Sequence, residues 1–345
     1  MHYFWYARQK SKAATKNQAT PAGGRETVEL SQLLLALYSA SRETPSGEFQ
    51  DKALDLLKAA VSFDSAIWGT GMMTPHGLDY HSIHLHNEPR EIISEHEHVK
   101  HQDTAALEVS LHRTTTRVFH SPTLLRGRDK SAIRDYVTRF GHQNIIISSE
   151  INQNTGYAYW VSLYRADAER QYTEHDRQLA VIICPHLREA LRINRVLHME
   201  RLRSMQVDGP MAIVDAKGAV YHTEPAFTAL LQNEWSSWDG SVLPQELWQA
   251  LIANGGCYAG KTIVVRRICV TDMMFLKARR RSAVDMLSAR ERTVAHYLAR
   301  GLSHKEIARV LGTSPQTVRN QIQAIHVKLA VHNTAELIAQ LNLAS

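Results

Sequence analysis

The spacing of apolar residues divides the chain into a mixed N-terminal region, a shorter mixed segment and a helical C-terminal end. Apolar residues recur at helical spacing from Val28 to Tyr38 and again from Phe49 to Ala60, which predicts two amphipathic helices. Two strand-like runs follow at 65–72 and 78–86. The remaining elements predicted in this region are helices near 89–99 and 129–140, strands at 144–151 and 157–165, and a long helix from Thr173 to about Arg203.

Helices that flank an antiparallel sheet make an α+β domain, which we expect over residues 28–205. The order of its elements resembles a GAF-type sensor domain, and so does the run Y-T-E-H-D-R-Q-L that leads into Pro185-His186-Leu187. The resemblance covers roughly residues 28–195. It implies a sensor that ends in a long connecting helix, while residues 1–27 before it are polar and predict a disordered arm.

A second, smaller unit is predicted at 209–278. Strand-like residues on both sides of Ala216-Lys217-Gly218 predict a hairpin, Pro225 opens a helix, and two strands fall within 261–277. This order resembles a PAS-like fold. The alternative is a structured linker that brings the sensor onto the C-terminal end.

Residues 284–345 carry start and stop signals for four short helices. Twice a serine stands three residues before a glutamate, which is a capping box, and a glycine suited to a helix end follows. These are Ser288 with Glu291 before Gly301, and Ser303 with Glu306 before Gly312. Ser314 followed by Pro315 then opens a third helix. Two helices joined by a short turn that contains glycine have the spacing of a helix-turn-helix.

The third helix has an apolar face and a polar face. Val318, Ile322, Ile325 and Leu329 recur at helical spacing and should pack inward. Arginine can bond guanine, and asparagine or glutamine can bond adenine, in the major groove of DNA. The candidate DNA-binding residues around this helix are Lys305, Arg309, Ser314, Gln316, Thr317, Arg319, Asn320, Gln323 and Lys328. We expect the lysines and Arg309 to hold phosphates, whereas Arg319 suits either role.

This stretch resembles the LuxR (GerE-type) transcriptional regulators. The matching residues are Leu287, Ser288, Arg290, Glu291, Gly301, Ser303, Lys305, Glu306, Ile307, Ala308, Leu311, Ser314, Thr317, Val318, Ile325, Lys328, Leu329, Val331, Ala335, Glu336 and Leu337. The resemblance implies that the third helix enters the major groove and that the fourth, about Thr334 to Leu341, dimerises. Arg319, Gln321, Ala330 and His304 depart from the family's usual Lys, His, Gly and Asn.

Charge follows the same division. The chain has a formal net charge of +6. From Lys277 to Ser345 there are 11 Lys and Arg against 4 Asp and Glu. The rest of the chain therefore has 29 Lys and Arg against 30 Asp and Glu. Positive charge is thus confined to the end predicted to bind DNA, where it would release counterions.

Other functional classes find little support. Three cysteines are too few and too scattered for a disulfide framework or a zinc knuckle, and no apolar run is long enough to span a membrane. The motifs G-x-S-x-G, H-E-x-x-H, the P-loop and G-x-G-x-x-G are all absent. We therefore expect a cytoplasmic, non-enzymatic protein without catalytic residues or a cofactor.

Histidine is unusually frequent between residues 81 and 120. His84 and His86 share one strand face, and His96 and His98 lie near two glutamates, but a metal site needs three or four convergent ligands. One face of a strand supplies at most two of these ligands. We therefore expect no metal and ordinary hydrogen-bonded histidines, with a pH-responsive role as the alternative.

Aromatic residues on the predicted strands suggest a ligand pocket. The candidate lining is Trp68, Tyr80, Tyr157, Tyr159 and Trp160, although aromatics at strand spacing also serve as core.

The sequence therefore predicts an α+β, GAF/PAS-like sensor region followed by an all-α, four-helix LuxR-type domain. The predicted function is a bacterial, signal-responsive DNA-binding regulator. The alternative is a constitutive DNA-binding protein whose N-terminal region only mediates assembly, and a metal-dependent enzyme is a distant third. The expected partners are promoter or operator DNA and a second copy of the chain. RNA polymerase and an unidentified small molecule are further candidates, and no membrane contact is expected.

Overall fold

The structure is a computed structural model that describes residues 22–74, 77–152, 155–204, 209–253, 255–270 and 273–344. Its contacts divide the chain into two compact units. The first holds residues up to Trp68, Leu85–Glu150 and Trp160–Asn194. The second holds the strand segments Gly69–His84 and Ile151–Tyr159 together with everything from Arg195.

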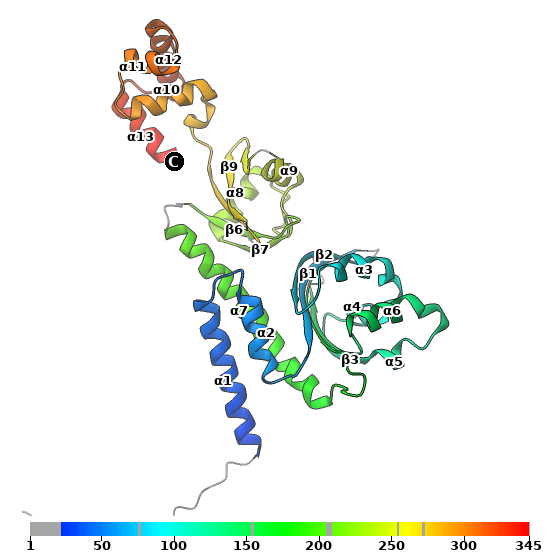
Figure 1. Ribbon diagram of the computed structural model, residues 1–345. Helices are drawn as coiled ribbons and strands as arrows, with labels where there is room; N and C mark the ends of the chain where they lie inside the picture. The colour runs from blue at the N-terminus through cyan, green and yellow to red at the C-terminus, as the bar shows by residue number, and fades with distance from the viewer. Residues whose placement is uncertain are drawn as a thin grey trace, which may run out of the picture. The chain divides into compact units, whose positions relative to one another are not determined.

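An antiparallel sheet of five strands organises the N-terminal region, in the order β2-β1-β5-β4-β3 (Figure 1). The strands are β1 (Ser65–Thr74), β2 (Gly77–His86), β3 (Thr114–His120), β4 (Asn144–Ile151) and β5 (Tyr157–Arg165). Its helices are α1 (Ala22–Glu43), α2 (Phe49–Lys58), α3 (Glu91–Val99), α4 (Thr104–Ser110), α5 (Ser121–Leu124), α6 (Ser131–Phe140) and α7 (Glu174–Ser204).

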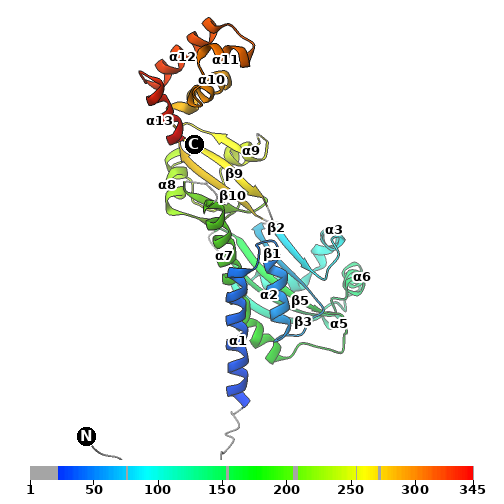
Figure 2. The same ribbon diagram turned by 60° about the vertical axis from the view of Figure 1, so that its left-hand side comes forward.

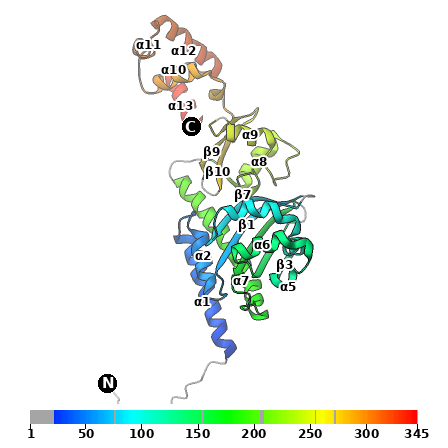
Figure 3. The same cartoon turned by 45° about the vertical axis from the view of Figure 1, so that its right-hand side comes forward.

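In the first unit, helices cover both faces of the sheet. Helices α1, α2 and α7 lie along one face (Figure 2), where Phe49, Leu163 and Ile183 are fully buried in a common core. Helices α3 to α6 lie on the opposite face (Figure 1), and Figure 3 shows α5 and α6 on this face from another side. There Phe119, Ile145 and Tyr164 pack with α4, while Ile133 and Val137 of α6 form a smaller cluster.

A second five-stranded sheet follows, in the order β7-β6-β10-β9-β8. Its strands are β6 (Met211–Val214), β7 (Val220–Thr223), β8 (Cys257–Ala259), β9 (Ile263–Val270) and β10 (Met274–Arg280), with helices α8 (Pro225–Glu234) and α9 (Gln245–Ala253). Phe227, Leu231 and Leu247 of these helices are buried against the sheet. Strand for strand, the order repeats that of the first sheet. Apolar residues of this unit are buried in a core of their own.

Most of the predicted elements are present within about two residues of the predicted ends, including both sheet hairpins. Strands β3 and β8 and helices α4, α5 and α9 were not predicted. Residues 1–21 of the expected arm lie outside the described residues, whereas α1 already begins at Ala22, so residues 22–27 extend the amphipathic helix instead of the arm. None of the helices in the described ranges is both long and apolar enough to cross a membrane.

The C-terminal end consists of the short 3-10 helix η3 (Ala283–Met286) and four α-helices. These are α10 (Ala289–Ala299), α11 (His304–Leu311), α12 (Pro315–Leu329) and α13 (Thr334–Ala344). The α+β region followed by an all-α, four-helix end confirms the predicted fold class.

Candidate nucleic-acid interface

Side-chain caps fix where the C-terminal helices begin. The Ser288 hydroxyl accepts a hydrogen bond from the Glu291 backbone N–H, and the Glu291 carboxylate accepts one from the Ser288 N–H at 2.8 Å. Ser303 and Glu306 form the same reciprocal pair at α11. Both predicted capping boxes are therefore confirmed, and each satisfies two backbone donors that the helix leaves unpaired.

The turn between α11 and α12 follows equally local rules. Gly312 ends α11 in the left-handed conformation, at φ 61°, which glycine adopts without steric cost. Ser314 then caps α12 by accepting from the Thr317 N–H at 3.0 Å, and Pro315 takes the first helical position. The result is the helix-turn-helix that the spacing predicts.

A small apolar core holds α12 against the other helices. Val318 and Ile325 are fully buried, and Leu329 is nearly so, together with Val294 of α10 and Ile307 of α11. Because these positions form one stripe of the helix, the opposite face of α12 is left exposed. Of the four predicted inward residues, Ile322 is only partly buried.

All nine candidate DNA-binding residues are exposed. Lys305 and Arg309 lie on α11, Ser314 caps α12, and six lie on α12 itself: Gln316, Thr317, Arg319, Asn320, Gln323 and Lys328. Five of those six fall in its first nine residues, so the amide and guanidinium groups gather at the N-terminal half of the helix. This half can enter a groove while the apolar stripe stays packed.

Two contacts organise this face before any partner binds. The Gln316 amide donates to the Asn320 side-chain oxygen at 3.0 Å, one helical turn away. Lys328 forms an ion pair with Glu291 at 2.8 Å. The hydrogen bonds that Glu291 accepts from Lys328 and Ser288 lower the pKa of its carboxyl to about 2. Lys328, a phosphate candidate, therefore already has an acidic partner in the free chain.

Comparison with protein families agrees with this geometry. Residues 285–341 match the sequence model of the bacterial regulatory proteins of the luxR family. Residues 285–341 are a LuxR-family domain. The match begins at Asp285 in η3 and ends at Leu341 in α13, so the LuxR-family domain contains the whole of the capped helix-turn-helix.

Individual relatives match a limited part of the chain. The chain is 42% identical over 96 residues to the transcriptional regulatory protein UhpA of Salmonella typhimurium, covering 27% of this chain and 43% of UhpA. It is 47% identical over 57 residues to the Fimbriae Z protein of Escherichia coli, covering 16% of this chain and 27% of that protein. The chain therefore spans less than half the length of either relative.

Solved structures give longer but looser matches. The crystal structure of Escherichia coli SdiA aligns over 91% of this chain and 96% of its own, with a TM-score of 0.37 and 13% identity. The phycoerythrobilin-bound GAF domain of a cyanobacterial phytochrome aligns over 50% of this chain and 97% of its own, with a TM-score of 0.33 and 11% identity.

The five aromatic residues proposed to line a pocket lie on strands β1, β2 and β5. Trp68 is 2% exposed and belongs to the core beneath α1, α2 and α7. Tyr157 and Tyr159 share one face of β5, with ring centroids 5.1 Å apart, whereas Trp160 faces the opposite way. Tyr80 is half-buried on β2. Tyr157 and Tyr159 thus share one strand face and Trp68 is a core residue, while a pocket lined by all five residues stays a prediction.

Tyr157 instead contributes to a buried polar cluster in the second unit. Its hydroxyl donates to Asp215 Oδ2 at 3.3 Å, and the same oxygen lies 2.7 Å from His81 Nδ1. Asp215 is fully buried and also accepts from the N–H groups of Lys217 and Ala219. Burial, reinforced by the charge of Asp215, raises the pKa of Tyr157.

A second buried polar cluster lies on the α3–α6 face of the first unit. His142 Nε2 is 2.7 Å from Glu88 Oε1, with side chains only 3% and 2% exposed, and the Ser65 hydroxyl donates to the same oxygen. The His142 ring stacks on Tyr164 at 3.5 Å, and burial raises the pKa of the Tyr164 hydroxyl. This cluster could not be recognised from the sequence, because Glu88, His142 and Tyr164 are far apart along the chain.

Most histidines of the predicted histidine-rich stretch have ordinary partners. His96 pairs with Asp103 at 3.0 Å, His98 bonds the Ser94 carbonyl, and His120 bonds Thr123. Burial alone would raise the pKa of Asp103, but the hydrogen bond and charge of His96 and two backbone N–H groups outweigh it and lower that pKa. Hydrogen-bonded histidines were expected, and these contacts agree.

Proposed function

We propose that this chain is a transcription regulator whose helix α12 enters the major groove of promoter DNA. The observation that carries the proposal is the exposed face of α12. Its polar residues gather at the N-terminal half of a capped helix inside a LuxR-family domain. UhpA, which is 42% identical to this chain over 96 residues, is itself described as a transcriptional regulatory protein.

Arg319 and Asn320 are the proposed base-reading residues. Both are exposed on α12, and each side chain can make two hydrogen bonds to the edge of one base. Gln316 donates to Asn320, which orients the asparagine amide before DNA arrives. Gln323 lies one turn after Arg319 and extends the readable face.

Lys305, Arg309 and Lys328 are proposed to hold phosphates, since phosphate contacts set register and orientation. Ser314 and Thr317 lie at the N-terminus of α12, where the helix dipole also favours a phosphate. The net positive charge from Lys277 onward supports such a surface.

We further propose that the chain binds DNA as a dimer through α13. Ala335 and Ala339 are exposed on this helix one turn apart, so a second copy could approach closely there. RNA polymerase remains a further candidate partner.

In-vitro selection with the purified full-length chain and a random duplex pool tests the DNA proposal. We expect enrichment of a short motif in two inverted copies, about 10 base pairs apart or a multiple of that. The Ala339→Arg variant should select single half-sites, whereas Ala253→Arg, at the end of α9, should select the wild-type motif. A pool with no enriched motif would refute sequence-specific binding, and a full inverted motif for Ala339→Arg would refute the dimer through α13.

The N-terminal α+β region is proposed to receive a small-molecule signal. One face of its sheet is filled by the core under α1, α2 and α7. The α3–α6 face instead buries His142, Glu88 and Tyr164 among apolar side chains, which is the mixture that ligand sites use. Binding there would shift the population between DNA-competent and incompetent arrangements.

Thermal-shift measurements on the full chain against fractionated cell extract test this input. A fraction that stabilises the wild type and not the Tyr164→Phe variant supports the α3–α6 face as the site. If no fraction raises the unfolding temperature, the result would favour the alternative function. In that case the N-terminal region only mediates assembly of a constitutive DNA-binding protein.

A further inference from the structure

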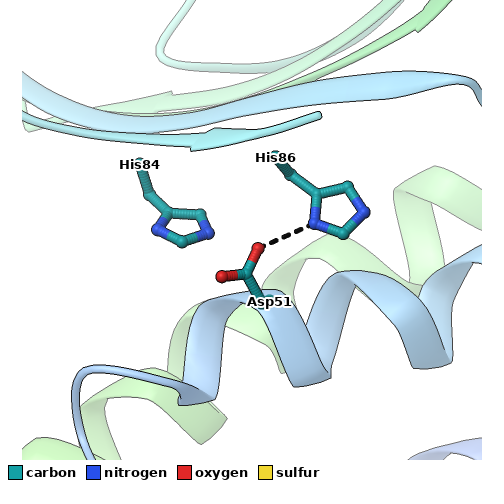
Figure 4. Close-up of side chains that lie close together, drawn as sticks. All are labelled: Asp51, His84 and His86. Carbon is teal, nitrogen blue, oxygen red and sulfur yellow. Dashed lines mark hydrogen bonds and ion pairs between the residues drawn. The ribbon is translucent and has the colours of Figure 1, made fainter. Parts of the chain in front are cut away.

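Three side chains able to bind a metal ion converge where α2 packs beside β2 (Figure 4). His84 and His86 are two residues apart on β2, so the strand itself directs both imidazoles to the same face. Asp51 comes from the first turn of α2 and points toward them. One ligand atom from each residue lies within 4.8 Å of the other two.

The distances suit a small divalent ion. Zinc lies about 2.0–2.2 Å from imidazole nitrogen and carboxylate oxygen, so its tetrahedral ligands are roughly 3.3 Å apart. The His86 Nδ1 to Asp51 Oδ1 distance is 2.8 Å, and the widest separation in the group is below 4.8 Å. Side-chain shifts of about 1 Å or less would therefore close the group around an ion.

The surroundings of His86 hold its ring in place. The side chain is 8% exposed, and the Phe63 ring contacts it edge-on at 6.0 Å between centroids. Asp55 lies one helical turn after Asp51, and its Oδ1 is 3.7 Å from His86 Nε2. Metal-binding histidines commonly place their second ring nitrogen against a carboxylate, which orients the ring and raises its basicity.

The acidic side of the group is open to solvent. The Asp51 side chain is 53% exposed, so an ion can reach the two histidines from that side. Three protein ligands leave a fourth position for water or another small ligand, as in zinc sites that exchange their fourth ligand.

We propose that Asp51, His84 and His86 form a binding site for one divalent transition-metal ion of the zinc type, with Asp55 as a positioning residue. Two imidazoles and one carboxylate are the ligand set that such ions prefer over calcium or magnesium. The bound ion would join α2 to β2, which is an edge strand of its sheet. The site uses no residue of the proposed DNA face, so it stands or falls independently of the proposed function.

Calorimetric titration of the tag-free, full-length chain with Zn²⁺ tests the site. We expect one equivalent to bind, with Asp51→Asn and His84→Gln each lowering the affinity by about a hundredfold, and Asp55→Asn by about tenfold. The matched control is His101→Gln, an exposed histidine of the same stretch, which should bind as the wild type does. Both ligand variants change side chains that are not part of the buried core, and their circular dichroism checks that they fold.

Cobalt provides a second readout. Co²⁺ bound by the three residues should give visible ligand-field absorption that Zn²⁺ displaces and that His84→Gln lacks. Failure of the wild type to bind Zn²⁺ would overturn the proposal. So would equal binding by the wild type and His84→Gln, because the ion would then be adventitious or held by the Asp51–His86 pair alone.

Discussion

The Lys328 ammonium lies 2.8 Å from the Glu291 carboxylate, which ties the C-terminal end of α12 to the capping box that begins α10. A side chain expected to hold a DNA phosphate therefore has a protein anion as its partner in the free chain. A phosphate must compete with Glu291 for Lys328, and the two roles have different experimental signatures.

Replacing Lys328 by alanine should weaken binding to all DNA sequences alike. Loss of one phosphate contact should also make the slope of log K against log[salt] less steep by about 0.9. Fluorescence anisotropy over a salt series measures both. Glu291→Gln is the matched control, because glutamine also completes a capping box and leaves Lys328 in place. An unchanged slope in Lys328→Ala would mean that the lysine only braces the domain.

Base readout by Arg319 and Asn320 predicts a loss of specificity as well as affinity. Each alanine variant should weaken binding to the selected site by roughly 1–3 kcal/mol and relax the preference at one base position. Competition among single-base variants of the site measures this. Arg300→Ala, an exposed arginine at the end of α10, should leave the preference intact. An unchanged base preference in Arg319→Ala would assign Arg319 to phosphate instead.

The ion pair between Arg279 and Asp285 joins the end of β10 to the start of the LuxR-family domain, with two contacts of 2.6 and 2.7 Å. Burial alone would raise the pKa of Asp285, but hydrogen bonds from Arg279 and Ser282 lower it to about 2. A carboxyl whose folded pKa is lowered stabilises the fold above its ordinary pKa and loses that contribution as the pH falls.

Asp285→Asn should therefore be less stable than the wild type at neutral pH, and the difference should shrink from about pH 4 down to about pH 2. Urea unfolding followed by circular dichroism at several pH values measures it. In an Arg279→Ala background the same substitution should lower the free energy of unfolding by less at neutral pH, because the main hydrogen-bond donor to Asp285 is gone. A difference that is constant from pH 7 to pH 3 would mean that Asp285 acts without its charge.

Local rules account for what could be predicted from the sequence. The caps at Ser288, Ser303 and Ser314 each depend on residues within three positions, so they could be assigned without knowledge of tertiary contacts. Strands β4 and β5 were equally clear because turn residues separate two strongly apolar runs. Strand β3 was missed because it lies at the sheet edge and only Phe119 is buried, which leaves no alternation to detect.

Contacts between distant segments could not be predicted. The sequence pattern gave His84 and His86 as two ligands on a strand, but nothing in it indicated that Asp51 of α2 would lie opposite them. Likewise, alternation separated Tyr159 from Trp160, yet it did not reveal that α1, α2 and α7 would fill the face that contains Trp68. In both cases the deciding information is which helix packs on which face.

Ala330 gives a prediction on stability alone. It ends α12 in the left-handed conformation, at φ 51°, where the LuxR-type pattern usually has glycine. A Cβ in this conformation costs roughly 1 kcal/mol, so Ala330→Gly should stabilise the domain by about that amount. Ala324→Gly, in the interior of the same helix, is the matched control and should destabilise by about 1 kcal/mol. Urea unfolding of both variants measures the pair. If the two changes destabilise equally, the left-handed end of α12 carries no strain that glycine relieves.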